Sequence, residues 1–304
     1  MGIIFLVPIR IFAHIYLRMP RKWAMMLGSA LGFVLRKAGL RSSVVRENLQ
    51  IAFPNDPDRR EQLYLEAYRH LGNLILEILG IFGPMRRFVL KYSELRGWEN
   101  WKAAHDQGKG VIFLASHVGN WELMAVTGAV FGQMDSLMVT KHLKPEWFHQ
   151  GIEAGRALCQ LRATYEPRTM RDILAHFKRG GTVGFVLDQY AGPPIGVRVP
   201  VFGVPVGTST AIAMLARRSG VPVVPVVNYR QKNGRYVVEI RPALKWEQAE
   251  TPELSIAINT AHYAKVLEKD IYDHPDQWLW THRRFKGDLS PLREGEWIDG
   301  RARR

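Results

Sequence analysis

His117 and Glu122 are five positions apart and lie where the sequence predicts that a buried strand ends and a helix begins. Residues 111–115 are apolar without a break, and a short apolar run bounded by turn residues is typical of such a strand. Gly119 and Asn120 supply the turn, and apolar residues then recur at helical spacing. We therefore expect a strand, a tight turn and a helix. His117 would then lie at the carboxyl end of the strand, where ligands bind in open α/β sheets.

These two side chains have the chemistry of a general base and its partner. An imidazole has an ordinary pKa of about 6.5, so it can accept a proton at neutral pH. A carboxylate on the other ring nitrogen would fix the tautomer, and Glu122 is the candidate. The alternative is a histidine packed in the core, with Glu122 only favouring the helix N-terminus. There is no Gly-x-Ser-x-Gly elbow, and Cys159 lies in no motif, so we expect direct attack by a substrate hydroxyl that His117 deprotonates.

Further candidates for the site follow later in the chain. Asp188 and Gln189 end a strand expected to run parallel to residues 111–115, which would bring them beside His117; the alternative is an ordinary turn. Residues 201–210 are expected to open a helix and to leave backbone N–H groups free for an oxyanion or phosphate. Four cations are candidate phosphate ligands, although each is alternatively a solvated surface charge: Lys141, Arg156, Arg217 and Arg218.

The composition narrows the classes of ligand. The single cysteine excludes an intramolecular disulfide and a cysteine-cluster metal site, and neither a Walker loop nor a dinucleotide-binding glycine motif is present. We therefore expect neither a metal nor a cofactor. Residues 282–286 place basic side chains behind Trp278 and Trp280, a mixture that can stack on nucleic acid. No recognisable nucleic-acid-binding fold accompanies them, so no nucleic-acid partner is expected.

The positive charge is concentrated at the N-terminus. The net charge is +14, and residues 1–46 carry +8 of it, because they hold eight Lys or Arg residues and no acid. Residues 3–17 and 23–35 are apolar runs between these charges, each shorter than a typical membrane-spanning helix. We expect one or two helices lying in the interface of an anionic membrane. The alternatives are a secretory signal peptide, for which a clear cleavage site is missing, and a buried helix pair.

Strand and helix patterns alternate after residue 97, which predicts an α/β fold with a mostly parallel central sheet flanked by helices. Pro222 and Pro225 predict that one strand lies at an edge of this sheet or carries a bulge. The expected strands cover residues 111–115, 136–140, 182–187, 221–227 and 235–241. The expected helices cover residues 41–53, 58–82, 121–130, 147–160, 169–179, 209–218 and 252–271.

The stretch from His117 to Glu122 resembles the His-x4-Asp/Glu motif of glycerolipid-type acyltransferases. Its Gly-Asn-Trp-Glu form is similar to that of the bacterial lipid A biosynthesis acyltransferase family, the lauroyl and myristoyl transferases. Other stretches match in the order found in that family, and together they cover nearly the whole chain: residues 46–54, 188–189, 201–205, 221–225 and 277–286.

The resemblance implies an O-acyltransferase with the glycerolipid acyltransferase fold and membrane-associated N-terminal helices, on the cytoplasmic face of a bacterial inner membrane. It would transfer a fatty acyl chain from an acyl carrier protein thioester to a hydroxyl of a lipid A precursor, an anionic glycolipid, without a covalent acyl-enzyme. His117 would be the base and Glu122 its partner. The implied substrate-binding residues are Asn120, Lys141, Arg156, Asp188, Gln189, Arg283 and Arg284.

The simplest domain division has three parts. Residues 1–40 would be the membrane anchor, residues 41–286 the acyltransferase domain, and residues 287–304 a basic tail. Two other functions stay open on the sequence alone. One is acyl transfer to a different glycolipid, such as a phosphatidylinositol mannoside, or to a lysophospholipid. The other is a non-catalytic membrane-binding protein, against which the intact His117 and Glu122 argue.

Overall fold

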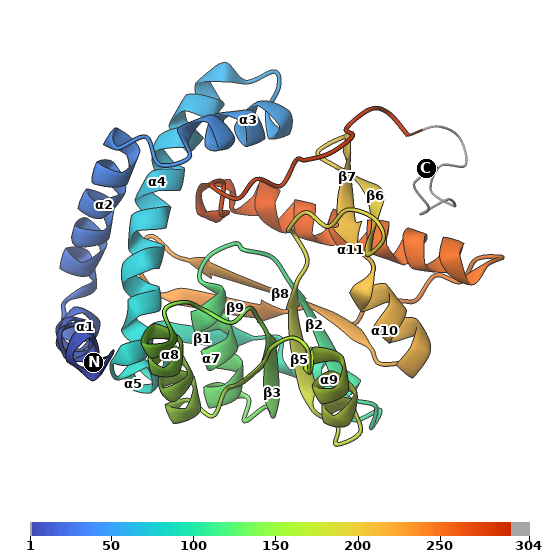
Figure 1. Ribbon diagram of the computed structural model, residues 1–304, viewed down its shortest axis with the longest axis horizontal. Helices are drawn as coiled ribbons and strands as arrows, with labels where there is room; N and C mark the ends of the chain where they lie inside the picture. Colours follow the sequence, from blue (N-terminus) through green and yellow to red (C-terminus); the bar gives the residue numbers. More distant parts are fainter. Residues whose placement is uncertain (1, 293–304) are drawn as a thin grey trace.

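Seven strands form one sheet in the order β1-β9-β8-β2-β5-β3-β4, and two more form the separate hairpin β6–β7 (Figure 1). Every pair in the sheet is parallel except β8 with β9. The computed structural model describes residues 2–292, with side chains from residue 6 onward. The prediction of an α/β fold with a mostly parallel sheet flanked by helices is confirmed.

The elements follow the predicted alternation, with several short ones added. The strands are β1 (Ser93–Arg96), β2 (Val111–Ala115), β3 (Ser136–Val139), β4 (Arg162–Thr164), β5 (Thr182–Val186), β6 (Gly196–Val201), β7 (Val204–Ser209), β8 (Val223–Arg230) and β9 (Tyr236–Ile240). The helices are α1 (Gly2–Arg18), α2 (Arg21–Lys37), α3 (Ser42–Ala52), α4 (Pro57–Leu79), η1 (Gly80–Phe82), α5 (Met85–Tyr92), α6 (Trp98–His105), α7 (Trp121–Phe131), α8 (Glu146–Leu158), α9 (Thr169–Phe177), α10 (Ala211–Ser219), α11 (Pro252–Asp273) and η2 (Pro275–Gln277).

Strand β2 is buried on both faces, as its unbroken apolar run predicts. Successive side chains point to opposite faces of a sheet. Accordingly, Ile112 and Leu114 pack with residues of α9, α10 and α11. Val111 and Ala115 pack with residues of α6, on the other face. The sheet is therefore a middle layer with helices on both faces. His117 follows the carboxyl end of β2, so it lies where the strands of this buried sheet end.

Strand β8 lies inside the sheet, between β9 and β2, so the edge position, one of the two alternatives expected for this strand, is wrong. Its parallel pairing with β2 ends at Pro225, and its antiparallel pairing with β9 begins at Val226. The missing proline N–H therefore falls where the strand changes its pairing. Both prolines still accept a hydrogen bond, Pro222 from Ile112 and Pro225 from Arg241, each at 2.9 Å.

The interpretation of residues 201–210 as the opening of a helix is also wrong. Residues 204–209 form β7, which pairs with β6 from Val201–Val204 to Gly196–Ser209. Its backbone belongs to this ladder, and α10 begins only at Ala211. The alternating valines of this stretch are the period-2 signal that the sequence interpretation overlooked. The stretch is therefore not the helix N-terminus that was expected to bind an oxyanion or phosphate.

Helix α2 packs closely against α4 through glycines. A Cβ atom added to Gly32 would lie 2.1 Å from the carbonyl oxygen of Tyr68, and one added to Gly72 would lie 2.1 Å from that of Gly28. Arg21 on α2 also forms a buried ion pair with Glu77 on α4, at 2.7 Å. Figure 1 shows α2 alongside α4 at the margin of the molecule. Helix α2 therefore belongs to the packed structure, and the domain division at residue 40 stays a prediction.

Apolar side chains remain exposed in a stripe on each of the first two helices. Val7, Ile11 and Ile15 recur every four residues along α1, and each is more than half exposed. On α2 the exposed apolar residues are Trp23, Met26, Leu27, Phe33 and Val34. Among the described helices, none combines the length and the apolar character needed to cross a membrane.

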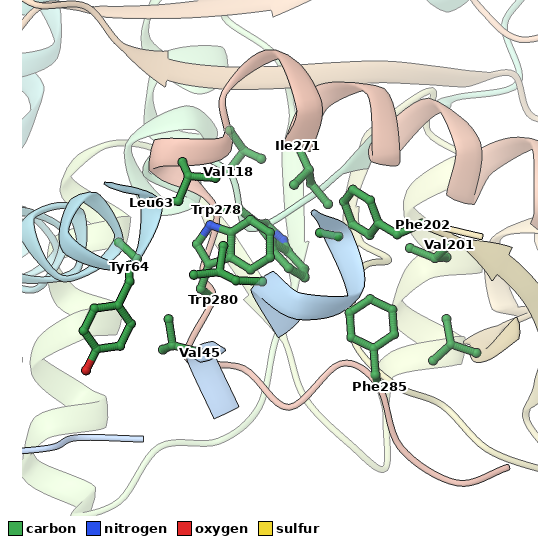
Figure 2. Packing of buried hydrophobic residues seen from close by; sticks show 14 of the residues in the cluster. Val45, Leu63, Tyr64, Val118, Val201, Phe202, Ile271, Trp278, Trp280 and Phe285 are labelled. Atoms are coloured by element: carbon green, nitrogen blue, oxygen red, sulfur yellow. The ribbon is translucent and has the colours of Figure 1, made fainter. Parts of the chain in front are cut away.

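The segment after α11 passes from the site to a second buried cluster. Val118 bridges to Trp278, and the backbone of His117 accepts a hydrogen bond from Leu279. Asn48 on α3 holds the segment further on, through the carbonyls of Trp280 and His282. Figure 2 shows both tryptophans at the centre of this cluster, between residues of α3 and α4 and residues near the hairpin: Val45, Leu63, Tyr64, Val201, Phe202 and Phe285.

Candidate active site

His117 is held by Asp188, from the end of the neighbouring strand β5. The imidazole Nδ1 lies 2.6 Å from Asp188 Oδ1, and the backbone N–H of His117 donates to Asp188 Oδ2 at 2.7 Å. Parallel pairing of β2 with β5 brings their carboxyl ends to one edge, as the sequence predicted. Because an ionised carboxylate only accepts, Nδ1 carries the proton, and Nε2 is the basic nitrogen.

Asp188 is a buried carboxylate that is stabilised in its ionised form. Burial by itself raises the pKa of Asp188. The charge of His117, the two hydrogen bonds from His117 and one from the Trp278 indole N–H at 2.7 Å together outweigh burial. The resulting pKa is lowered to about 2. Asp188 therefore stays charged at neutral pH and can stabilise the imidazolium that forms when His117 accepts a proton.

Gln189 covers the basic nitrogen of the pair. Its side-chain Nε2 lies 3.2 Å from His117 Nε2, so the amide donates to the lone pair that would take a substrate proton. The backbone carbonyl of Gln189 accepts from Arg284 at 3.1 Å. A substrate hydroxyl that reaches Nε2 must therefore displace or share this amide contact.

The turn after β2 needs both of its residues. Gly119 has a positive φ of 67°, and a Cβ there would lie 2.1 Å from the carbonyl oxygen of Asn228 on β8. Asn120 caps α7, because its side chain accepts from the Leu123 N–H at 3.0 Å. Asn120 is fully buried. The structure thus gives this predicted substrate-binding residue a capping contact.

Glu122 does not contact the His117 ring nitrogen, contrary to the expectation from its spacing. Its two oxygens accept from Arg156 Nε and Nη2 at 2.7 and 2.9 Å, and both side chains are buried. Arg156 also donates to Glu153 at 2.8 Å and to Tyr165 at 3.3 Å. Glu122 lies in the first turn of α7 and points to α8, whereas the imidazole of His117 points to the end of β5. The pair joins α7 to α8 beside the site.

We expect Arg156→Lys to destabilise the fold rather than act as a conservative change. A lysine ammonium cannot reproduce the two parallel hydrogen bonds to Glu122. Breaking a buried pair by removing one partner costs about 3–5 kcal/mol, and the retained charge of lysine should reduce this to about half. Urea unfolding would measure the loss. Arg162→Lys is the matched control, because its ion pair with Asp135 is exposed; an equal loss in the two variants would contradict the prediction.

A largely apolar cavity of about 460 Å³ lies beside the imidazole. His117, Trp121 and Gln189 line it near the end of β2. The sheet forms one wall and α7 contributes Met124, Ala125 and Gly128 to the other. A volume of this order accommodates a ligand of drug size. The cavity continues over several strands of the sheet, so an extended apolar group can lie in it with a reactive end at His117.

The remaining predicted residues fall in three places. Lys141 is exposed and lines the cavity, and Arg283 is exposed next to the site segment. Arg284 is buried, donating to the Gly207 carbonyl and Thr208 hydroxyl at 2.6 Å each, and burial lowers its pKa to about 10. Arg217 and Arg218 lie in the last turn of α10, shortly before the start of β8. Because β8 runs parallel to β2, they lie at the opposite end of the strands from His117.

Trp278 is the site residue that the sequence interpretation missed. Its indole N–H donates to the same carboxylate oxygen that accepts from the His117 backbone. The chain separates it from Asp188 by 90 residues, so no local spacing could reveal the contact. Among the described residues, no group of three or more His, Cys, Asp or Glu side chains is arranged to hold a metal ion.

Comparison with known proteins gives a consistent family. The model of the bacterial lipid A biosynthesis acyltransferase family matches residues 2–287. The chain is 28% identical to a lipid A biosynthesis palmitoleoyltransferase of Escherichia coli over 277 residues, which cover 90% of this chain and 88% of that protein. It is also 28% identical to a lauroyltransferase of the same organism (86% and 84% covered). A lipid A biosynthesis acyltransferase of Haemophilus influenzae is 25% identical (81% and 78% covered).

Proposed function

Because the chain belongs to the bacterial lipid A biosynthesis acyltransferase family, we propose that it transfers a fatty acyl chain from an acyl carrier protein thioester to a hydroxyl of a lipid A precursor. The observation that supports this reaction is the position of the His117–Asp188 pair at an apolar cavity. A basic nitrogen beside space for a hydrocarbon chain fits acyl transfer. A binding module would need the cavity but not the pair.

In this mechanism the nitrogen Nε2 of His117 accepts the proton of the acceptor hydroxyl as the oxygen attacks the thioester carbonyl. Asp188 keeps the proton on Nδ1 and stabilises the imidazolium. The carbon–sulfur bond of the resulting tetrahedral intermediate then breaks, and the imidazolium returns its proton to the leaving thiolate. The products are the ester and the free thiol of the carrier, and the enzyme regains its starting protonation state.

Neither candidate nucleophile near this region favours an acyl-enzyme. Ser116 is buried at the end of β2, and Cys159 is buried after α8. Burial raises the pKa of the Cys159 thiol to about 11, so it is protonated at neutral pH. A thiol is a much weaker nucleophile than a thiolate. Direct attack by the acceptor hydroxyl is therefore the proposed route.

We assign the binding of the anionic groups of the two substrates to the exposed cationic side chains at the site. Lys141 lines the cavity, and Arg283 follows the Trp278 segment. Both have accessible charged ends for a phosphate of the acceptor or of the phosphopantetheine arm. Arg156 lines the cavity too, but its guanidinium is engaged by Glu122, Glu153 and Tyr165, so we assign it a positioning role.

The proposal is tested by lipid mass spectrometry with purified protein. The protein is incubated with an acyl carrier protein thioester and, separately, with a lipid A precursor, a phosphatidylinositol mannoside and a lysophospholipid. Acylation of the lipid A precursor alone is the expected result, and acylation of another lipid in preference to it would refute the assignment. A parallel incubation with a coenzyme A thioester decides the donor.

We further propose that the exposed stripes of α1 and α2 lie in the cytoplasmic interface of the inner membrane. The stripes are flanked by basic residues, among them Arg10, Arg18 and Lys22. Apolar side chains that enter the interface together with cations that meet anionic head groups are the two signals that hold a protein on a membrane. This arrangement would bring a lipid acceptor to the same surface as the protein.

Charged substitutions in the stripe should release the protein from membranes. Replacing both Ile11 and Ile15 by Glu removes about 1.5–3 kcal/mol of burial for each side chain, so partitioning onto anionic vesicles should fall by at least tenfold. Both positions are more than half exposed, so folding should be unaffected. Vesicle co-sedimentation after a high-salt wash measures the effect. Leu158→Glu, at an exposed apolar position on α8, is the control; equal release by this variant would refute the assignment.

A further inference from the structure

The cavity crosses the strands instead of following one of them. Its lining includes Leu95 on β1, Ile240 on β9, Val226 on β8, Phe113 on β2 and Gly184 on β5, which is the order of these strands in the sheet. His117 lies just after β2, the fourth strand of this series. The cavity therefore extends from the imidazole in two directions, which we name the β1 arm and the β3 arm.

The two arms differ in polarity. The β1 arm is lined by Leu95, Val226, Val238 and Ile240, all of which are apolar. The β3 arm also has apolar lining residues, but several polar or charged side chains lie among them. The apolar residues are Leu137, Met138, Val139 and Leu161, and the polar or charged ones are Ser136, Thr140, Lys141, Glu166 and Thr169. A hydrocarbon chain gains free energy in proportion to the apolar area it removes from water, and a polar wall loses its hydration to such a chain.

We propose that the acyl chain lies in the β1 arm and that Leu95, with Ile240 beside it, sets the longest chain that the enzyme accepts. This inference rests on the proposed acyltransferase function and adds to it the route and the length limit of the chain. The residue that ends the arm is on an edge strand, where β1 closes the sheet. Helix α7 packs against β1 and closes the arm from the other side.

The length of the arm fits a chain of medium length. From β2 to β1 there are three strand spacings, in the order β2-β8-β9-β1. At about 4.8 Å per spacing the arm is roughly 14 Å long. A methylene adds roughly 1.3 Å to an extended chain, given a carbon–carbon bond of about 1.5 Å, so the arm holds on the order of ten carbons. We therefore infer a preference for lauroyl over palmitoyl donors. The sequence comparison does not distinguish the two chain lengths, because the chain is equally identical to a lauroyltransferase and to a palmitoleoyltransferase.

Leu95 can be changed without opening the main core, because it is only partly buried. Leu95→Ala lengthens the arm, and Leu95→Phe shortens it. Gly184, on the opposite side of β2, provides the matched control, since a Cβ added there meets no atom within 4 Å. Gly184→Ala therefore adds a methyl group outside the β1 arm without displacing a neighbour, and Gly184→Val fills more of the same space.

The experiment measures kcat/KM of the full chain with octanoyl, lauroyl, myristoyl and palmitoyl thioesters, each presented on acyl carrier protein. Leu95→Ala should raise the palmitoyl-to-lauroyl ratio by about tenfold or more, and Leu95→Phe should lower the preferred length, because one methylene in an apolar pocket changes the ratio by roughly tenfold or more. The Gly184 variants should change the rates without reordering the chain lengths. Thermal unfolding of each variant verifies its folding.

A second measurement does not depend on variants. A donor with a photoreactive diazirine on the terminal carbon should label the peptide containing Leu95 or that containing Ile240. Labelling of the Met138 or Gly184 peptide would overturn the proposal, as would reordering of chain lengths by Gly184→Val together with unchanged ratios for the Leu95 variants. A wild-type preference for palmitoyl would overturn the length limit. Absence of transfer with every donor would instead refute the proposed function.

Discussion

His117→Ala should reduce acyl transfer by about 10²–10⁴-fold while the protein stays folded. Among the described residues, the His117 ring is the only group that contacts Asp188 and also presents a basic nitrogen to the cavity. Alanine removes the proton acceptor, but it leaves the apolar cavity intact, so the KM for the donor should change much less than kcat. Single-turnover transfer from a labelled thioester measures the loss of the chemical step.

His142→Ala is the matched control, because this histidine is exposed on the loop before α8, close to the exposed Lys141. It should retain nearly full turnover. A His117→Ala variant with turnover near that of the wild type would show that another group removes the proton. Circular dichroism and the unfolding midpoint of both variants separate a lost base from a lost fold.

Asp188→Asn should also cost about 10²–10⁴-fold in kcat, because the amide no longer fixes the proton on His117 Nδ1 or stabilises the imidazolium. The substitution keeps the size of the side chain, so the cavity and the KM for the donor should change little. The Asp188 carboxylate accepts three hydrogen bonds, two from His117 and one from Trp278. An asparagine amide has an NH₂ group in place of one carboxylate oxygen, so it would present a donor to at least one of these donors. Steady-state kinetics over a range of donor concentrations gives both parameters.

Trp278→Phe tests the same assignment in a graded way. It removes one indole hydrogen bond from Asp188 and keeps an aromatic ring in the packed cluster, so kcat should fall by less than for Asp188→Asn. Glu122→Gln is the opposing comparison, since its carboxylate binds Arg156 and not the imidazole. We expect Glu122→Gln to lower the unfolding midpoint clearly, and to change kcat of the folded protein only slightly. A loss of kcat at Glu122 that exceeds the loss at Asp188 would return the partner role to Glu122.

The sequence determined the elements that carry the chemistry. The apolar run before His117, the Gly119–Asn120 turn and the helical period after it each have a local physical cause, and the structure confirms the strand, the turn and the helix. Matched stretches along nearly the whole chain identified the family, which the match over residues 2–287 confirms together with the acyltransferase class. The expectation that the strands before His117 and Asp188 run parallel also predicted correctly that the two residues lie side by side.

Local patterns were misleading where an outcome depended on neighbouring elements. Pro222 and Pro225 predicted an edge strand or a bulge, but β8 changes its pairing at Pro225, so both of its sides are paired in the sheet. The valines of β6 and β7 had the period of a hairpin, but the glycine, threonine and serine residues beside them favoured a helix N-terminus. Pairing of two strands is a property of both, and one segment alone does not define it.

The tertiary structure alone decided which acid serves the histidine. Spacing along the chain favoured Glu122, five residues from His117, yet the direction of a side chain depends on the element that carries it. The turn directs α7 so that Glu122 meets Arg156 of α8, while the parallel register of β2 and β5 places Asp188 at 2.6 Å from the ring. The third donor, Trp278, comes from 90 residues further along the chain. Sequence proximity constrains only neighbouring backbone, whereas hydrogen bonds depend on distances in space, which the packing of the sheet and its helices sets.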